Sequence, residues 1–357
     1  MNDKDNCQAK KILIQLPGIA QHPTIAQQYE LELEPLDPIG AEIIDVGWKD
    51  TETFFKHAGE GDAVLTSWGV RFDTEAIKAL KKCAIISVGS IGTDMVDVEA
   101  ATEAGIVVTN VPDIFIEEVA DHAMMFLLGL NKLVKKMMRF TDEGRWWETR
   151  PIPSAIPRLR GQTLGILGFG NVGTAVTRRA KPFGLNVIAY DPYVSELKMA
   201  SEDVEPVSFD ELVKRSDYIS IHAPDNPETN QIFNAEAFKK MKSTAVIINT
   251  SRGTLIDEKA LIKALEDGDI AGAALDVLQQ EPPAEDHPLR KKDNVILTPH
   301  SASASTRMRR ETRRRAAREV ALTLTGRWPL SCVNPQGLPR MELARWQPYP
   351  MDHGPNR

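Results

Sequence analysis

The chain has 357 residues, of which 42% are hydrophobic and 26% charged, and its formal net charge is −7. These values are ordinary for a soluble globular protein of about two domains, and the negative charge argues against nucleic acid or an anionic membrane as a partner. No apolar run approaches the roughly 18 residues of a membrane span, and the polar N-terminus lacks a signal core. The three cysteines are scattered, without metal-site spacing. We therefore expect a cytoplasmic protein without a metal site.

The first hundred residues alternate between apolar runs and amphipathic segments. The runs are typical of buried parallel strands, and the segments between them are typical of crossover helices. We predict strands at 11–17, 63–66, 84–88 and 106–108, and helices at 74–80 and 96–104. An α/β domain should therefore occupy residues 1–111, completed by a segment at 302–335 that contains a helix at about 303–325.

A long helical pattern rich in Ala, Met and Leu runs from Ile116 to Met138. We interpret it as one helix that crosses between two domains, with His122 packed between them. Residues 144–161 are proline-rich and irregular, and they include Trp146 and Trp147. In this segment we predict no regular element.

The second domain, predicted at 112–301, is organised around residues 163–191. A glycine-bounded apolar run, typical of a buried strand, leads into a helical pattern. Between them lie Gly168, Gly170 and Gly173 in G-x-G-x-x-G spacing. These glycines permit, in order, the tight turn, the approach of backbone to a pyrophosphate and the packing of helix on strand. The first turn of the helix, with Asn171 and Val172, would face the phosphates.

Asp191 ends the next apolar run, at 187–190. A carboxylate at this position accepts hydrogen bonds from both ribose hydroxyls and would repel a 2′-phosphate. The strand, the helix and the closing acid together are the context that confirms the glycine motif. The sequence therefore predicts a dinucleotide site that favours NAD over NADP.

Three polar residues follow later strands of this domain. We predict further strands at 218–222, 245–248, 271–276 and 295–297, alternating with helices at 209–215, 234–241 and 257–267. Together with the two apolar runs that precede and follow the glycine motif, they make about six parallel strands. Arg252, Glu281 and His300 come after the last three of these strands. Because ligands bind beyond the carboxyl ends of such strands, we expect these residues at the edge that carries the glycine loop.

This trio suits one chemistry. Arg252 can hold a carboxylate in a bidentate fork and polarise an adjacent carbonyl. His300 suits general acid–base catalysis, and Glu281 can accept its other ring N–H and favour the protonated ring. Beside a nicotinamide, these groups predict hydride transfer between a 2-hydroxy acid and a 2-oxo acid.

At this point the chain resembles the D-isomer-specific 2-hydroxyacid dehydrogenase family. The resemblance covers roughly residues 60–335 and rests on LGILGFGNVG (164–173), MKSTAVIINTSRGTLID (241–257), AALDVLQQEPP (273–283) and LTPHSASAST (297–306). It implies two Rossmann-like or flavodoxin-like domains with doubly wound parallel sheets, an active site in the interdomain cleft, NAD as cofactor and a homodimer. It also implies that Trp146 or Trp147 packs in the dimer interface or reaches the neighbouring active site.

The resemblance also assigns roles residue by residue. Arg252, Glu281 and His300 become the catalytic residues. The implied cofactor contacts are His222, Ala223 and Pro224 on the adenosine side, Thr250 and Arg252 beside the nicotinamide ribose, Asp276 at the carboxamide, and Thr229.

A first-domain segment, SVGSIGTDMVD (87–97), resembles the family's substrate loop. The backbone N–H groups of Ser90, Ile91 and Gly92 would bind the substrate carboxylate, and Trp68 either lines the pocket or packs beside it. The family usually has Gly at the position of Ser90 and Asn at that of Met95. Because of these departures, we do not transfer a substrate preference from the family.

Two alternatives stay open. The segment REVALTLTGRWPLSCVNP (318–335) resembles the C-terminal-binding proteins, NAD(H)-binding corepressors of the same family, although that branch has Trp near Ser303. A 3-phosphoglycerate dehydrogenase would need additional cations in the first domain, where Arg71 is the evident candidate. The intact trio favours catalysis on a small 2-oxo acid.

The C-terminal part has an arginine-rich segment and a polar tail. Arginines are concentrated between Arg307 and Arg318, at helical spacing, and we interpret them as a solvated helix face. The tail at 336–357 has few apolar residues, and we expect it to be poorly ordered.

Overall fold

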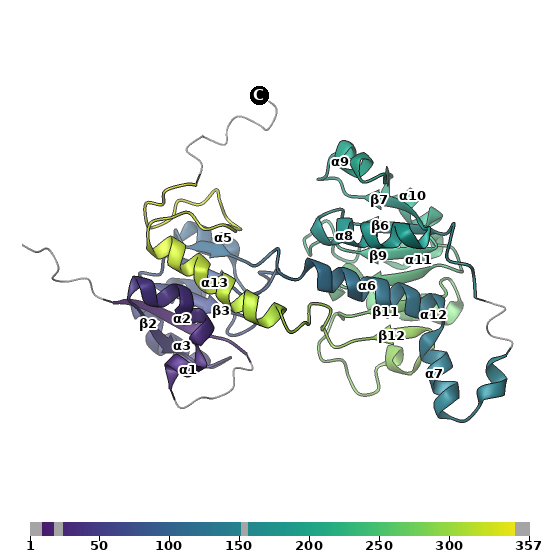
Figure 1. Ribbon diagram of the computed structural model, residues 1–357, viewed down its shortest axis with the longest axis horizontal. Helices are drawn as coiled ribbons and strands as arrows, with labels where there is room; N and C mark the ends of the chain where they lie inside the picture. The colour runs from purple at the N-terminus through teal and green to yellow at the C-terminus, as the bar shows by residue number, and fades with distance from the viewer. Residues whose placement is uncertain (1–8, 18–23, 151–155, 347–357) are drawn as a thin grey trace, which may run out of the picture. The chain divides into compact units, whose positions relative to one another are not determined.

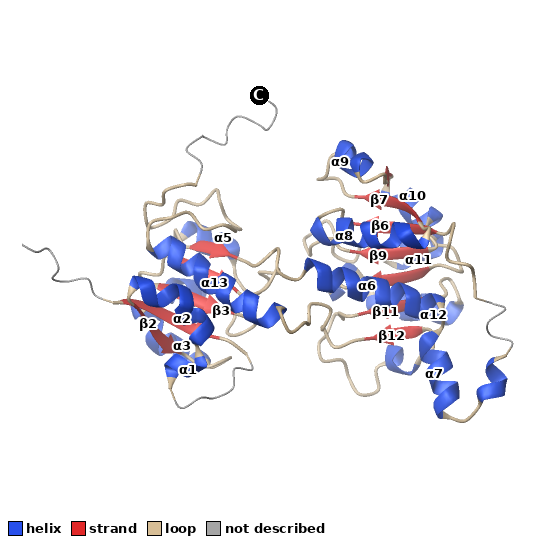
Figure 2. Ribbon diagram, viewed as in Figure 1, coloured by secondary structure: helices blue, strands red, loops and turns tan. Residues whose placement is uncertain are grey.

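The computed structural model describes residues 9–17, 24–150 and 156–346. Its contacts divide the chain into two compact units. Unit 1 comprises residues 1–114 and 306–357, and unit 2 comprises residues 115–305. Each unit contains one parallel sheet (Figures 1 and 2). Each unit also contains two separate clusters of buried apolar side chains. The predicted α/β class is therefore confirmed.

Unit 1 has a five-stranded sheet in the order β2-β1-β3-β4-β5. Neighbouring strands pair in parallel, and the order is that of a flavodoxin-like sheet. Its strands are β1 (Lys10–Gln15), β2 (Ala41–Asp45), β3 (Ala63–Thr66), β4 (Ile85–Val88) and β5 (Val107–Thr109). β3, β4 and β5 are fully buried, which explains why the sequence pattern is a continuous apolar run and does not alternate.

The helices of unit 1 include elements that the sequence pattern did not indicate. They are α1 (Ile25–Gln28), α2 (Glu30–Leu36), η1 (Asp37–Ile39), α3 (Thr51–His57), η2 (Ala58–Glu60), α4 (Thr74–Ala79), α5 (Val98–Glu103) and α13 (Met308–Leu324). The missed elements are α1 to α3 and strand β2, which is short and carries acids at both exposed positions. The C-terminal helix α13 packs against α2, β3 and β4, and the Ser87 hydroxyl donates to the Ala316 carbonyl over 2.9 Å.

Unit 2 has a seven-stranded parallel sheet in the order β12-β11-β10-β9-β6-β7-β8. Its strands are β6 (Thr163–Leu167), β7 (Asn186–Tyr190), β8 (Glu205–Pro206), β9 (Tyr218–Ile221), β10 (Val246–Asn249), β11 (Gly272–Leu275) and β12 (Val295–Leu297). The strand order reverses at β6, because β7 pairs with one edge of β6 and β9 with the other. In such sheets ligands bind at this reversal, beyond the carboxyl ends of the two strands, here β6 and β9. The count of about six strands missed β8, because this exposed two-residue edge strand has no apolar run.

Helices connect the strands of unit 2. They are α6 (Ile116–Asn131), α7 (Val134–Asp142), η3 (Trp146–Thr149), α8 (Asn171–Ala180), η5 (Lys181–Phe183), α9 (Glu196–Ser201), α10 (Phe209–Arg215), α11 (Ala235–Lys240), η6 (Gly253–Leu255), α12 (Glu258–Asp267) and η7 (Pro288–Lys291). Side-chain caps define several starts, including a capping box between Ser208 and Glu211 at α10. Part of the segment expected to be irregular, Trp146–Thr149, forms the short helix η3, and residues 151–155 lie outside the described residues.

The single helix predicted at 116–138 is wrong. α6 ends at Asn131, and α7 starts at Val134 after Leu133, which has a left-handed φ of 52°. Tertiary hydrogen bonds stabilise this break without Gly or Pro. The Asn131 amide donates to the Tyr218 hydroxyl over 2.8 Å, and Lys135 donates to the carbonyl oxygens of Lys292 and Val295 at 2.8 Å. Local sequence carries no signal for such contacts.

The arginines of α13 are not simply a solvated face. Arg313 forms a bidentate ion pair with Glu32 of α2, with both N···O distances 2.5 Å, and Glu32 is fully buried. Arg315 pairs with Glu319, which is also buried and accepts from the Leu330 backbone N–H over 2.7 Å. Paired charges thus attach α13 to the rest of unit 1.

The described part of the tail, residues 336–346, is held by specific contacts, which corrects the expectation of poor order there. Arg340 donates to the carbonyl oxygens of Ala104 at 2.7 Å and Leu80 at 2.8 Å. Trp346 donates to the Trp328 carbonyl over 2.8 Å. Residues 347–357 lie outside the described residues. No helix in the described part of the chain is long and apolar enough to span a membrane.

We predict that Arg313→Met lowers the free energy of unfolding by about 3–5 kcal/mol, because it leaves the Glu32 carboxylate buried without its counter-charge. Arg314→Met is the matched control, since its partner Glu34 is half exposed, and it should change stability little. Denaturant unfolding of both variants checks the difference, and equal losses would contradict the assigned importance of the buried pair.

Candidate active site

The glycine loop lies at the carboxyl end of β6, the centre of the unit 2 sheet. Gly168 has φ +88°, and a Cβ there would lie 2.6 Å from the backbone nitrogen of Ala223. A Cβ on Gly173 would lie 2.2 Å from the Gly168 carbonyl oxygen, whereas one on Gly170 would meet nothing within 4 Å. The first and third glycines are thus required by packing, and the second leaves open space beside the N-terminus of α8. That space suits a pyrophosphate, and the contact stays a prediction.

Asp191 lies directly after β7, and its carboxylate orders two loops. It accepts from the backbone N–H of Phe169, in the glycine loop, over 2.8 Å and from that of Tyr193 over 2.9 Å. These bonds fix the carboxylate next to the glycine loop. A carboxylate oxygen has more than one acceptor site, so Asp191 can still receive ribose hydroxyls.

The loop after β9 contains the predicted adenosine-side residues. Ala223 is buried against Gly168, Pro224 is exposed, and the His222 ring shares a 2.8 Å hydrogen bond with the Ser220 hydroxyl. Loss of solvent around the ring lowers the pKa of His222 to about 3, so the ring is neutral at physiological pH. The Thr229 hydroxyl donates to the Pro224 carbonyl over 2.6 Å and thereby shapes the loop; its cofactor contact stays a prediction.

The loop after β10 carries Thr250 and Arg252. A Cβ on Gly253 would lie 2.1 Å from the Leu278 carbonyl, so only glycine lets this loop pack against the turn after β11. The Asn249 side chain donates to the Arg252 carbonyl over 2.8 Å and fixes its backbone. The Thr250 hydroxyl is buried and has no hydrogen-bond partner within the described ranges, which suits a ligand contact.

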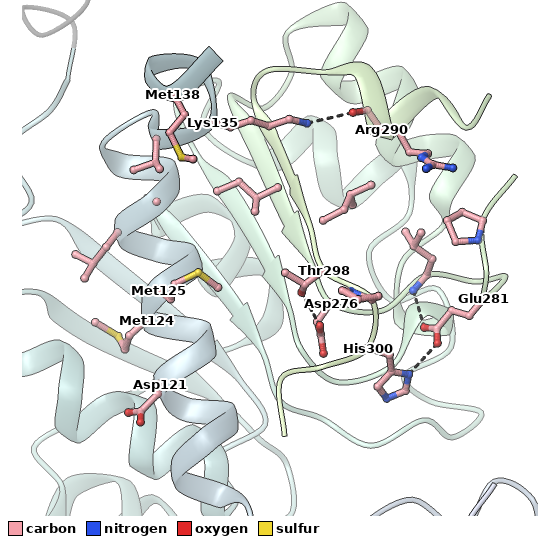
Figure 3. Close-up of a pocket in the computed structure, with 18 of the residues that line it drawn as sticks. Asp121, Met124, Met125, Lys135, Met138, Asp276, Glu281, Arg290, Thr298 and His300 are labelled. Atoms are coloured by element: carbon pink, nitrogen blue, oxygen red, sulfur yellow. Dashed lines mark hydrogen bonds and ion pairs between the residues drawn. The ribbon is translucent and has the colours of Figure 1, made fainter. Parts of the chain in front are cut away.

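Glu281 and His300 form a pair. The Glu281 Oε2 atom lies 2.8 Å from His300 Nδ1, and its Oε1 accepts from the Leu278 backbone N–H over 3.0 Å (Figure 3). Burial opposes the charge on Glu281, but the His300 and Leu278 hydrogen bonds and the Arg252 charge together lower its pKa. Since an ionised carboxylate can only accept, His300 Nδ1 carries hydrogen, and a proton exchanged with a substrate would pass through Nε2.

The structure thus brings Arg252, Glu281 and His300 together. They follow β10, β11 and β12, which are adjacent in the sheet. His300 has a left-handed φ of 53°, stabilised by a 2.8 Å hydrogen bond from its backbone N–H to the Asp276 carbonyl. A strained conformation that surrounding bonds enforce is a common feature of functional positions.

Asp276 supports the histidine loop. Its carboxylate accepts from the backbone N–H groups of Ser301 and Ala302, both at 2.8 Å, and from the Thr298 hydroxyl at 2.5 Å. Its side chain is 1% exposed. These bonds show what Asp276 does in the protein itself, and the contact to a carboxamide stays a prediction.

His122 belongs to this network, which the sequence did not indicate. Its Nε2 lies 3.0 Å from the Thr298 hydroxyl, inside unit 2, and its ring packs edge-on against Phe126. The single hydroxyl hydrogen of Thr298 is directed at Asp276, so His122 Nε2 donates. Burial lowers the pKa of His122, against the opposing effect of Asp276. No sequence spacing links residues 122, 276 and 298.

In unit 1, the loop after β4 presents backbone N–H groups. The carbonyl oxygens of Ser90, Ile91 and Gly92 accept from the Val111 N–H at 2.9 Å, the Asn110 amide at 2.7 Å and the Ser90 hydroxyl at 2.6 Å, respectively. Among the described residues, none accepts from the N–H groups of residues 90–92. Such an arrangement suits a carboxylate.

Trp68 follows β3 of unit 1. It has a left-handed φ of 52°, its side chain is 38% exposed, and its carbonyl oxygen accepts from the Trp48 indole over 2.9 Å. Whether Trp68 lines a substrate pocket stays a prediction.

A groove of about 1460 Å³ lies on unit 2 between α6, α7 and the last strand. Methionine side chains of α6 and α7 form one wall, and His300 and Glu281 lie at one end (Figure 3). The apolar lining includes Met124, Met125, Leu128, Met138 and Ile296. No group of three or more His, Cys, Asp or Glu side chains in the described part of the chain could hold a metal ion.

Comparison with known proteins identifies the family of this chain. Residues 124–302 match the model of the D-isomer specific 2-hydroxyacid dehydrogenase NAD-binding domain. A glyoxylate reductase of Korarchaeum cryptofilum is 39% identical over 80% of this chain and 88% of its own length. The chain belongs to the D-isomer specific 2-hydroxyacid dehydrogenase family.

Further relatives of this dehydrogenase are named for different activities. A D-3-phosphoglycerate dehydrogenase of Methanocaldococcus jannaschii is 35% identical over 90% of this chain, which spans 60% of that longer protein. The crystal structure of a glyoxylate reductase from Paecilomyes thermophila has a TM-score of 0.80 and 30% identity, covering 92% of this chain and 99% of that one. The chain is thus an NAD-dependent oxidoreductase acting on the CH–OH group of 2-hydroxy acids.

We predict that His300→Ala lowers kcat by about 10²- to 10⁴-fold, because the group that exchanges the substrate proton is lost. Glu281→Gln should lower kcat less, and Arg252→Ala should also raise KM for the oxo acid. Steady-state kinetics with NADH measures these effects. His57→Ala, which removes a surface histidine of unit 1 paired with Glu60, should behave as wild type. Full activity of His300→Ala would refute the assignment.

Proposed function

We propose that this dehydrogenase reduces a small 2-oxo acid to the D-2-hydroxy acid in the cell, with NADH as the hydride donor. The single observation that carries the proposal is the Glu281–His300 pair, at 2.8 Å, on the strand-end edge that also holds the glycine loop. The glyoxylate reductases among its relatives support a small substrate.

The proposed roles follow from the chemistry of each side chain. NADH supplies the hydride when bound. His300 Nε2 donates a proton to the carbonyl oxygen of the substrate as the hydroxyl forms, and Glu281 stabilises the protonated ring through Nδ1. Arg252 binds the substrate carboxylate and polarises the carbonyl. For unit 1 taken by itself, we propose that the N–H groups of residues 90–92 are carboxylate donors.

Cofactor retention is proposed to involve the α8 N-terminus for the pyrophosphate and Asp191 for the adenosine ribose. Residues 222–224 and Thr229 would contact the adenosine half, and Thr250 and Asp276 the nicotinamide half. The open space beside Gly170 supports this assignment, as does the Thr250 hydroxyl, which has no hydrogen-bond partner among the described residues.

A phosphorylated substrate is the second candidate, since phosphoglycerate dehydrogenases are among the relatives. Arg71 is exposed in unit 1 and is the candidate cation for this substrate. The chain spans 60% and 53% of two such relatives, so their whole activity is not transferred to it.

We also propose a cytoplasmic homodimer in which a second copy covers the methionine-lined groove. Met125, Val134 and Met138 are 46%, 40% and 60% exposed, and Trp146 and Trp147 are 61% and 71% exposed. Such an apolar surface on a water-soluble unit is typical of an interface. The free thiols of Cys83 and Cys332 are consistent with a reducing compartment.

The activity experiment is NADH oxidation with a panel of 2-oxo acids: glyoxylate, hydroxypyruvate, pyruvate, phenylpyruvate, 2-oxoglutarate and phosphohydroxypyruvate. We expect kcat/KM above about 10⁴ M⁻¹s⁻¹ for a small unphosphorylated acid. Preference for phosphohydroxypyruvate would establish the second candidate. Tight NADH binding without turnover of any acid would favour the regulatory alternative.

For the dimer, we predict that Met138→Glu shifts the protein toward monomer, because a charge would be buried in the apolar interface. Sedimentation velocity across a concentration series measures the shift. Leu197→Glu is the matched control, since Leu197 of α9 is 80% exposed and outside the groove. A monomeric wild type, or a dimer unaffected by Met138→Glu, would contradict the proposed interface.

A further inference from the structure

A second carboxylate lies near the adenosine end of the cofactor site. Glu228 is exposed in the loop that follows β9, and Asp191 follows β7. These two strands flank β6, whose carboxyl end bears the glycine loop. The two acids therefore approach the cofactor site from the two sides of the glycine loop.

Tyr193 connects the two sides. Its backbone N–H donates to Asp191 Oδ1 over 2.9 Å, and its hydroxyl donates to Glu228 Oε2. One residue thus bonds to both carboxylates. Glu228 and Asp191 both contribute to raising the pKa of Tyr193, with the Glu228 hydrogen bond as the largest cause.

Hydrogen bonds within a turn fix the backbone at Glu228, although its side chain is exposed. Its backbone N–H donates to the Asn226 side chain over 2.9 Å, and that same oxygen accepts from the Thr229 N–H over 3.0 Å. The Thr229 hydroxyl closes the turn on the Pro224 carbonyl. The backbone of this turn and the Tyr193 hydroxyl together direct the Glu228 carboxylate toward the β7 side.

We propose that Glu228, positioned by Tyr193, is a second determinant of the selectivity for NAD(H) over NADP(H). The 2′-phosphate of NADP(H) adds nearly two negative charges to the adenosine ribose, which Asp191 is assigned to bind. Each carboxylate near that ribose raises the free energy of the bound phosphate by repulsion. NAD(H) lacks the phosphate and is not affected. Removing Asp191 alone would therefore leave part of the discrimination in place.

The inference rests on the proposed ribose contact of Asp191, so the experiment tests both separately. NADH and NADPH are titrated by cofactor fluorescence against the full-length protein without substrate. The variants are Asp191→Asn, Glu228→Gln, the double variant and Tyr193→Phe. Glu228→Gln keeps an acceptor for Tyr193 and removes only the charge. Glu236→Gln, which removes an exposed acid of α11, is the matched control.

We expect Glu228→Gln to tighten NADPH binding about fivefold while NADH binding stays within twofold. A fivefold change corresponds to removing the repulsion between two like charges in water. The double variant should bind NADPH more tightly, relative to NADH, than either single variant does. Tyr193→Phe should give a smaller gain, because the carboxylate remains but is released. The advantage of Glu228→Gln for NADPH should shrink between 0.05 and 0.5 M salt, since exposed charges are screened.

Three results would overturn the inference. An unchanged NADPH-to-NADH ratio in Glu228→Gln, with a changed ratio in Asp191→Asn, would refute the role of Glu228 and leave the ribose contact standing. Unchanged ratios in both variants would refute the ribose contact as well. An equal loss of both cofactors in Glu228→Gln would indicate a purely structural role.

Discussion

The carboxylate of Asp276 is the constraint on which the candidate active site depends. It is buried at the end of β11 and accepts from two consecutive backbone N–H groups, of Ser301 and Ala302. These bonds bend the chain back immediately after β12, and His300 takes its left-handed conformation in that bend. A charged acceptor of two backbone donors is among the stronger polar interactions in proteins, and it is stronger when buried. The reactive ring is therefore oriented by the backbone before any ligand binds.

Close packing at glycine brings the other two residues to the histidine. Gly253 follows Arg252 and lies directly against the turn at Leu278, and the N–H of Leu278 holds Glu281. A larger residue at 253 would separate the arginine loop from the glutamate loop. The same device operates at Gly168, which packs against the backbone of the β9 loop. Glycines thus join the strand-end loops of β6 and β9, and of β10 and β11.

Much of the fold and of the candidate site could be predicted from the sequence. Parallel strands place their carboxyl ends at one edge of a sheet, and the sequence motifs lie at those ends. The class of fold and the assembly of Arg252, Glu281 and His300 follow from that rule alone. What could not be predicted depends on contacts between distant residues. The break at Leu133 results from Lys135 bonding to carbonyls near residue 292, and the link from His122 to Asp276 passes through Thr298. Neither has a local periodicity or a fixed spacing.

The two ends of the site in unit 2 differ in charge, and this difference fits the two ligand groups proposed for them. Arg252 and His300 are on the β10 to β12 side, where an anionic oxo acid needs a cation and a proton donor. Asp191 and Glu228 lie after β7 and β9, where the adenosine ribose should carry no phosphate. Glu228 is exposed and Asp191 is partly buried, so the repulsion by Glu228 is weak, about that of one like charge across water, and adds to the repulsion by Asp191. The hydrogen bond from the Tyr193 hydroxyl then matters because it keeps the Glu228 carboxylate on the β7 side. It does so without using the Asp191 oxygens that are proposed to accept the ribose hydroxyls.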